Sequence, residues 1–254
     1  MKERLNGTVA LVTGASSGIG EATARELARQ GAAVAIVARR EERLEKLASE
    51  IRAEGGKVLV IVADVTDQEQ AKASVERTVK ELGRLDTVIN NAGVMLLGPV
   101  VGAPTEEWDR MVSLNVQGLL YVAHAALPHL LRAAEDPLRR VADLVNVSSV
   151  AGRTARAGRA VYNLTKWGVG AFSEALRQEV TSRYVRVSLV EPGAVDTELP
   201  NHIRPELRSQ MMGALDSLEK LTSEDIADNI VYIVTRPRRV AVNEILVRPT
   251  QQEG

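Results

Sequence analysis

Short apolar runs alternate with amphipathic stretches along the chain from residue 8 to residue 248. Runs rich in Val, Ile and Ala are typical of strands that are buried on both faces of a sheet, whereas apolar residues at helical spacing predict helices. The predicted strands lie near residues 8–13, 33–38, 57–62, 86–90, 142–148, 185–190 and 243–248. The predicted helices lie near residues 18–30, 40–54, 67–82, 105–132, 158–181 and 223–235.

This alternation predicts an α/β fold with a parallel sheet, helices on both faces and right-handed crossovers. The chain has 254 residues and shows no linker or repeat beyond the alternation itself, so we expect a single domain over residues 1–254. Residues 199–220 interrupt the pattern with Pro200, Pro205 and Gly213. We interpret this segment as a mobile lid over a substrate, with a plain surface loop as the alternative.

The first predicted strand leads directly into the glycine-rich turn Thr13-Gly14-Ala15-Ser16-Ser17-Gly18-Ile19-Gly20, and a helix follows. Glycines let the backbone turn tightly and approach a pyrophosphate, and the N-terminus of a helix favours an anion. A glycine-rich string alone is a weak signal, but the strand before it and the helix after it are the context that a dinucleotide site requires. The sequence therefore predicts such a site here.

The second predicted strand ends in Arg39-Arg40. An NAD site usually has Asp or Glu near this point, which bonds the ribose 2′-hydroxyl group. A guanidinium group instead pairs well with a 2′-phosphate. The two arginines therefore predict NADP(H) rather than NAD(H), with the alternative that they only begin the charged helix that follows.

Tyr162 and Lys166 stand four residues apart in the helix predicted over residues 158–181, so their side chains share a face. A nearby ammonium group, together with the charge of a cationic nicotinamide ring, favours the phenolate and lowers the pKa of a tyrosine from about 10. Such a tyrosine acts as general acid in reduction and as general base in oxidation. Ser149 follows the strand predicted over residues 142–148, where its hydroxyl group can hold a substrate oxygen. The alternative interpretation is that Tyr162 is a surface tyrosine, Lys166 a solvated lysine and Ser149 a turn residue, without a catalytic role.

In this order, the motifs resemble the short-chain dehydrogenase/reductase family across nearly the whole chain. Further matching positions are Asp64-Val65, Asn90-Asn91-Ala92-Gly93, Asn115, and Pro192-Gly193 with Thr197. The resemblance implies a single Rossmann-type, doubly wound domain with a seven-stranded parallel sheet. It also implies an NADP-preferring oxidoreductase that acts on CH–OH and C=O groups.

The resemblance assigns catalytic roles to Asn115, Ser149, Tyr162 and Lys166. In the family, the asparagine supports the lysine through a water, and the lysine also bonds the nicotinamide ribose. The implied cofactor site comprises Thr13, Gly14, Ser16, Ser17, Gly18, Ile19, Gly20, Arg39, Arg40, Asp64, Val65, Asn91, Ala92, Gly93, Tyr162, Lys166, Pro192, Gly193, Val195 and Thr197. Substrate contacts are expected from Met95, Leu96, Ser149, Val150, Arg153, Tyr162, Ala194 and His202.

Within this set, Arg153 is a candidate partner for a substrate carboxylate, with a solvated loop arginine as the alternative. Local strings also resemble clavulanate dehydrogenase-type aldehyde reductases, which suggests the reduction of an aldehyde or ketone, in secondary metabolism. These strings lie at residues 93–100, 174–180, 196–199 and 244–250. The same strings suit enzymes acting on serine-like 3-hydroxy acids. An NADP(H)-sensing protein without turnover and a dehydratase or epimerase stay open as further alternatives.

Composition narrows the range of partners. A net charge of −1 and an aromatic content of 3% give no case for a nucleic-acid partner. The chain has no cysteine, and His124 and His129 have no identifiable convergent partners, so we predict no disulfide, thiol nucleophile or metal site. No apolar run reaches the roughly 18 residues of a membrane span, and no signal peptide fits the first residues, so a cytoplasmic location is expected. The family resemblance implies a small-molecule substrate and a homotetramer or homodimer, formed by the helices near 105–132 and 158–181.

Overall fold

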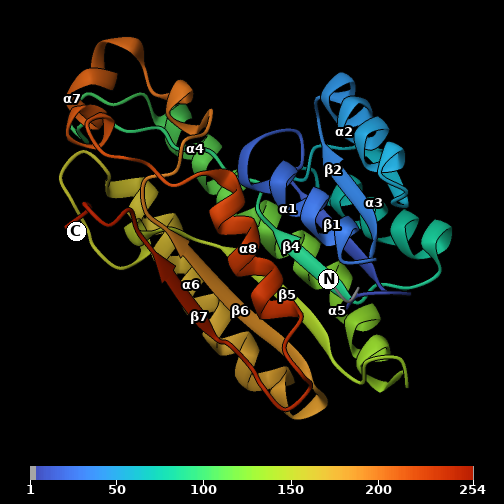
Figure 1. Ribbon diagram of the computed structural model, residues 1–254. Coiled ribbons are helices and arrows are strands. Elements are labelled where there is room, and N and C mark those ends of the chain that lie inside the picture. The colour runs from blue at the N-terminus through green and yellow to red at the C-terminus, as the bar shows by residue number, and fades with distance from the viewer. Residues whose placement is uncertain (1–3, 254) are drawn as a thin grey trace.

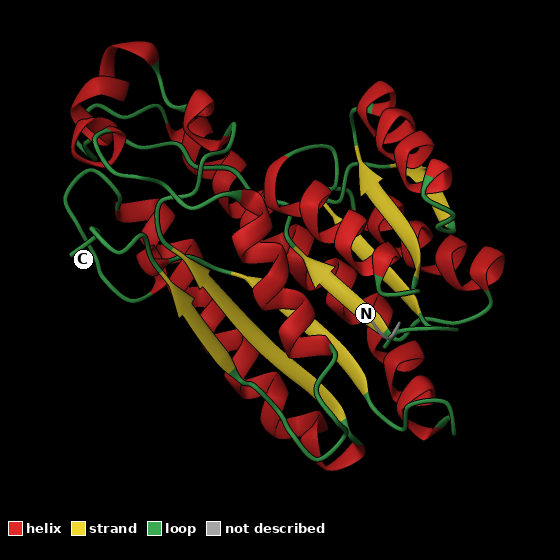
Figure 2. Ribbon diagram, viewed as in Figure 1, coloured by secondary structure: helices red, strands yellow, loops and turns green. Residues whose placement is uncertain are grey.

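A twisted parallel sheet with helices on both faces forms the protein (Figure 1 and Figure 2). The computed structural model describes residues 4–253, without the side chains of residues 214–216. Within that part of the chain, the strands are β1 (Val9–Thr13), β2 (Ala33–Ala38), β3 (Val58–Val62), β4 (Thr87–Asn90), β5 (Ala142–Val147), β6 (Val185–Pro192) and β7 (Glu244–Val247). Their order in the sheet is β3-β2-β1-β4-β5-β6-β7, which confirms the predicted seven-stranded, doubly wound architecture.

The direction of winding changes between β1 and β4, which are neighbours with Ala10 opposite Thr87. In open α/β sheets, ligands bind in the crevice outside the carboxyl ends of the strands at such a switch point. The glycine-rich turn that follows β1 and the loop that follows β4 therefore meet at the same edge of the sheet.

The helices confirm most of the predicted pattern. They are α1 (Gly18–Arg29), α2 (Glu41–Ala53), α3 (Gln68–Leu82), α4 (Thr105–Val112), α5 (Leu119–Glu135), α6 (Ala160–Val180), α7 (Pro205–Asp216) and α8 (Ser223–Val234). The single helix predicted near residues 105–132 consists of α4 and α5, joined by a π-helical turn, η1 (Ser113–Gly118). Over residues 4–253, none of the helices has both the length and the apolar character that crossing a membrane demands.

Both faces of the sheet are buried, each by its own group of helices. Val9 and Leu11 of β1 pack into a core that includes residues of α3, α5 and α6, whereas Ala10 and Val12 pack into a core that includes residues of α1, α2 and α8. Because alternate residues of one strand face different cores, four of the five positions of β1 are apolar. This explains why the sequence shows continuous apolar runs instead of alternation.

The segment at residues 199–220 differs from its prediction as an irregular loop. It contains a 3₁₀ turn, η4 (Leu199–His202), followed by α7. Pro205 is the first residue of α7, a position that tolerates proline because its missing N–H group has no intrahelical partner. Ile203 and Met212 are buried against the loop from Val94 to Leu97. The mobility of the segment stays a prediction.

Candidate active site

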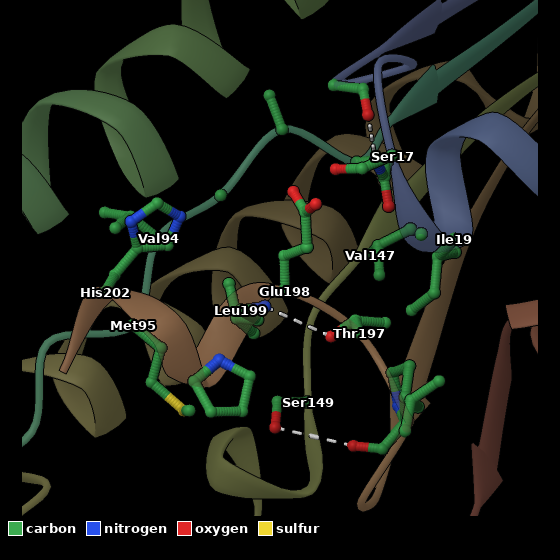
Figure 3. A pocket seen from close by; sticks show the side chains of 18 of the residues that line it. Ser17, Ile19, Val94, Met95, Val147, Ser149, Thr197, Glu198, Leu199 and His202 are labelled. Atoms are coloured by element: carbon green, nitrogen blue, oxygen red, sulfur yellow. Dashed lines mark hydrogen bonds between the residues drawn. The ribbon is translucent and has the colours of Figure 1, made fainter. Parts of the chain in front are cut away.

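A long pocket runs along the carboxyl ends of the strands, with the glycine-rich turn at one end and the η4–α7 segment at the other. In Figure 3, the side chains of Met95, Leu199 and His202 gather on one side, and Ser17, Ile19 and Thr197 lie on the other. The predicted set that lines it comprises Gly14, Ser16, Ser17, Gly18, Ile19, Arg39, Arg40, Asp64, Val65, Asn91, Ala92, Gly93, Met95, Ser149, Val150, Tyr162, Lys166, Pro192, Gly193, Ala194, Val195, Thr197 and His202. The structure therefore brings together residues that are scattered over most of the chain.

The glycine-rich turn is shaped by contacts that admit no side chain. Gly14 has a φ of +66°, and a Cβ atom there would lie 2.8 Å from the Cα atom of Ala92. A Cβ atom on Gly20 would overlap the carbonyl oxygen of Gly14. The bare backbone and the N-terminus of α1 face the pocket, which is the arrangement that binds a pyrophosphate.

Thr13 and Gly20 lie behind the pocket lining and hold its shape. The Thr13 hydroxyl group accepts hydrogen bonds from the backbone N–H groups of Asn91, at 3.0 Å, and Ala92, at 3.1 Å. The side-chain amide of Asn91 donates in return to the Thr13 carbonyl oxygen, at 3.0 Å. These bonds tie the turn after β1 to the loop after β4.

Arg40 joins both sides of the pocket at its rim. Its guanidinium group donates to the hydroxyl groups of Ser16, at 3.0 Å, and Ser17, at 2.6 Å, and pairs with Glu198 at 2.8 Å. Arg43 holds the other carboxylate oxygen of Glu198, at 2.7 Å. These two arginines lower the pKa of Glu198 to about 2, because they stabilise its charged form by hydrogen bonds and charge.

Arg39 is less constrained than Arg40: its side chain is 71% exposed and lies 3.4 Å from Asp64. Of the two predicted arginines, Arg40 is therefore the better placed to meet a phosphate group beside Ser16 and Ser17. Sequence reasoning missed Arg43 and Glu198. Arg43 lies three residues after Arg40, the N-cap residue of α2, and this short spacing could have revealed it, whereas Glu198 is 158 residues from Arg40.

Tyr162 and Lys166 project from α6 into the floor of the pocket, where both are buried. The Lys166 Nζ atom donates to the carbonyl oxygen of Val147, at 3.0 Å, and lies 5.8 Å from the centre of the Tyr162 ring. Ser149 begins the 3₁₀ turn η2 (Val150–Gly152), and its hydroxyl oxygen accepts from the N–H group of Ala151 at 3.1 Å. One phenol, one ammonium and one hydroxyl group thus converge.

Burial sets the acid–base properties of this trio. Burial raises the pKa of Tyr162, and a hydrogen bond with Ser149 and the positive charge of Arg159 oppose that rise. Burial also lowers the pKa of Lys166 to about 8. Among the protein groups, desolvation of the phenol therefore outweighs the charges around it, and the lowering expected from Lys166 together with a cationic nicotinamide ring stays a prediction.

Asn115 lies in the π-helical turn and is buried behind the pocket lining. Its side chain accepts from the N–H group of Val94, at 2.8 Å, and donates to the Val94 carbonyl oxygen, at 2.9 Å. A Cβ atom on Gly93 would lie 3.3 Å from the Asn115 oxygen and 3.9 Å from Lys166 Nζ. The two side chains therefore approach the same point, and the proton-relay role of Asn115 stays a prediction.

Two residues predicted to contact substrate lie outside the lining of this pocket. Leu96 lines a separate small pocket with Trp108. Arg153 pairs through its Nε atom with both oxygens of the buried Glu191, at 2.7 and 2.8 Å, and also with Glu244. The expectation that Arg153 holds a substrate carboxylate is therefore corrected, because its guanidinium group is already bound to two carboxylates.

Sequence reasoning also missed several residues of the lining. One group belongs to the segment predicted as a lid, or to the chain beyond it: Leu199, Pro200, Arg208, Met212, Lys220 and Gln252. Their contribution depends on the packing of this segment across the pocket. Another is Arg159, three residues before Tyr162, and the rest are Val37, Ala38, Ala63, Val94, Leu114, Val147, Ser148, Asp196 and Glu198.

Comparisons with known proteins agree with the fold. The family model described as short chain dehydrogenase matches residues 8–208. An uncharacterized oxidoreductase of Listeria monocytogenes is 37% identical over 96% of this chain and 97% of its own length. The glycine betaine reductase of Emericella nidulans is 38% identical over 99% of this chain, which spans only 19% of that protein.

A solved structure shows the same arrangement. The closed form of a serine dehydrogenase complexed with NADP⁺ superposes with a TM-score of 0.88 at 30% identity. The match covers 97% of each chain.

Proposed function

Because this chain belongs to the short-chain dehydrogenase family of oxidoreductases, we propose that it uses NADP(H) to reduce an aldehyde or ketone to an alcohol, reversibly. The observation that carries the proposal is the pocket itself. Tyr162, Ser149 and Lys166 lie at its floor, and the glycine-rich turn with Arg40 lies at its other end. The similar serine dehydrogenase structure is a complex with NADP⁺, and this supports NADP(H) as the coenzyme.

The residues present fit such a coenzyme. The backbone after β1 is bare at Gly14 and Gly18, both with positive φ, and the N-terminus of α1 lies beside them. Arg40 with Ser16 and Ser17 offers a charged and hydroxyl-rich site for a 2′-phosphate. NADPH, when bound, supplies the hydride. Lys166, Asn91 and the segment from Pro192 to Thr197 line the space between this turn and Tyr162.

Tyr162 supplies the proton in reduction. Because burial raises its pKa, the phenol is protonated at neutral pH and ready to act as a general acid at the carbonyl oxygen. The Ser149 hydroxyl group would hold the same oxygen and stabilise its developing charge. Lys166, with a pKa of about 8, carries a positive charge near neutral pH and favours the phenolate that proton transfer leaves behind.

The η4–α7 segment would close the site from above. Its residues Leu199, His202 and Met212 line the pocket opposite the catalytic floor. Closure of such a segment excludes water and commits a substrate. We propose that residues 199–220 act as this lid within a single catalytic domain. A role in secondary metabolism, suggested by the local strings that resemble clavulanate dehydrogenase-type reductases, remains a prediction.

The experiment is NADPH consumption against a panel of aldehydes, ketones and oxo acids, with the reverse reaction followed on hydroxy acids and NADP⁺. Consumption that requires a carbonyl substrate supports the proposal. Stoichiometric binding of NADPH without consumption across the panel would contradict it and favour a sensing protein. The similarity to a serine dehydrogenase favours, as a second candidate, oxidation of a 3-hydroxy acid at the same site.

A further inference from the structure

Arg159 is a cation at the substrate end of the pocket that lacks an acidic partner within the described residues. It caps the N-terminus of α6, three residues before Tyr162, and it lines the pocket. Its side chain is half-buried and makes one long hydrogen bond, at 3.4 Å, to the carbonyl oxygen of Met211. By contrast, Arg153 binds two carboxylates and Arg204 pairs with Glu107 at 3.0 Å.

Holding an unpaired guanidinium group in this place is unfavourable. Burial lowers the pKa of Arg159, and the positive charge of Arg156 lowers it further. Charged side chains that lose water are normally paired or hydrogen-bonded, because desolvation is otherwise uncompensated. An anion in the pocket would supply the missing partner.

The other charges of the pocket leave room for that anion. Among the acidic side chains of the lining, Asp64 pairs with Arg39, and Glu198 is held by Arg40 and Arg43. Asp196 lies where the pocket meets a second one, lined by Arg25. At the substrate end, the lining also includes Arg208 and Lys220, so cationic side chains predominate there.

We propose that Arg159 binds an anionic group of the substrate, so that the preferred substrates are small oxo acids and the corresponding hydroxy acids. This inference rests on the proposed function. The planar guanidinium group of Arg159 suits a carboxylate, which it can bind through two parallel hydrogen bonds. Arg159 and Tyr162 line the same pocket, and the positive charge of Arg159 is close enough to lower the pKa of the Tyr162 phenol. A carboxylate on Arg159 and a carbonyl group at Tyr162 can therefore belong to one small molecule.

The reaction balances with the carboxylate unchanged. The carbonyl carbon gains the hydride of NADPH, and the carbonyl oxygen gains the proton of Tyr162. The products are the hydroxy acid and NADP⁺, and Tyr162 recovers its proton from solvent. Arg159 takes no part in these transfers and fixes the position of the substrate.

Arg159 has an alternative role, the tuning of the Tyr162 pKa, which an experiment must distinguish from the binding of a substrate carboxylate. Its positive charge lowers the pKa of Tyr162, so the arginine could serve only to tune the phenol. Tuning would affect charged and uncharged substrates alike, whereas binding of a carboxylate would affect only substrates that carry one. The ratio of the two activities therefore distinguishes the roles.

The test compares kcat/KM for 4-oxobutanoate and for its methyl ester, and for 3-oxobutanoate and its methyl ester, at saturating NADPH. We expect Arg159→Met to lower the acid-to-ester ratio about 10- to 100-fold, the usual effect of losing a charge-assisted hydrogen bond. Arg159→Lys should restore part of the ratio. Arg156→Met, at an exposed arginine three residues earlier and outside the pocket lining, controls for the loss of a nearby charge and should change the ratio far less than Arg159→Met.

Binding of butanoate, measured by calorimetry, tests the arginine without turnover. We expect its dissociation constant to rise about tenfold in Arg159→Met, with thermal unfolding confirming that the variant is folded. Equal dissociation constants in the variant and the unchanged protein would overturn the inference. So would an equal loss of activity on acids and esters, accompanied by a shift of the pH profile. A failure to reduce any carbonyl would instead refute the proposed function, and calorimetry would still decide the role of Arg159.

Discussion

Arg40 and Glu198 form an ion pair of 2.8 Å that connects the start of α2 to the base of the η4–α7 segment. They are 158 residues apart in the chain and meet at the rim of the pocket. Arg40 also bonds Ser16 and Ser17, so the same guanidinium group serves the proposed phosphate site and the base of the proposed lid. A 2′-phosphate and the Glu198 carboxylate would therefore compete for it.

This competition predicts that Glu198→Gln binds NADPH about two- to fivefold more tightly, the effect typical of an exposed ion pair. The affinity for NADH, which has no 2′-phosphate, should stay unchanged. Fluorescence titration of both coenzymes measures the two dissociation constants. In an Arg40→Met background the effect of Glu198→Gln should vanish, because the shared cation is gone. Weaker NADPH binding by Glu198→Gln would show instead that the carboxylate orients Arg40 for the phosphate.

The lowered pKa of Lys166 predicts that the stability of the fold depends on pH. Its pKa is about 8 in the folded protein, below the ordinary value of 10.5, because burial disfavours the charged form. Between these values the unfolded chain binds more protons, so stability rises with pH through this window. Lys166→Met removes the effect. The free energy of unfolding of Lys166→Met, minus that of the unchanged protein, should therefore be larger at pH 7 than at pH 10.5. The two values should differ by up to about 3 kcal/mol.

Urea unfolding of both proteins at the two pH values measures this difference, and groups common to both proteins cancel. Lys166→Arg serves as the control, because a guanidinium group stays charged at both pH values. If Lys166→Met differed from the unchanged protein by the same free energy of unfolding at pH 7 and at pH 10.5, this result would contradict the lowered pKa of Lys166.

Arg153 is expected to act on stability and not on the choice of substrate. Its variant Arg153→Met leaves Glu191, which is 1% exposed, without its cation, and should destabilise the fold by about 3 kcal/mol. The double variant Arg153→Met/Glu191→Gln should recover part of this loss, because no buried charge remains. Urea unfolding measures both effects. A fall in the acid-to-ester activity ratio of Arg153→Met would return this arginine to the substrate site.

Local patterns in the sequence were sufficient for the strands, most helices and the residues at the ends of strands. The glycine-rich turn, Ser149, Tyr162 and Lys166 were predicted because each depends on short-range spacing within one element. The helix α7 was missed because proline and glycine, here Pro205 and Gly213, are typical of loops. The segment is held in place by the burial of Ile203 and Met212 against residues that are distant in the sequence.

The roles of the arginines could not be predicted from local patterns. Arg153 and Arg159 lie in the same connection between β5 and α6, and the sequence gives no local reason to prefer one. The carboxylates that bind Arg153 are 38 and 91 residues away, so only the packed sheet shows that it is paired and that Arg159 is not. The same reasoning applies to Glu198, whose partners belong to another element.

The central claim, proton transfer by Tyr162 beside a bound coenzyme, is tested most directly by Tyr162→Phe. The variant should bind NADPH within severalfold of the unchanged protein, because the phenol oxygen is only one of many groups that line the pocket. Its turnover of a carbonyl substrate, followed as NADPH consumption, should fall about 10²- to 10⁴-fold, the usual contribution of a general acid. Turnover equal to that of the unchanged protein would contradict the claim.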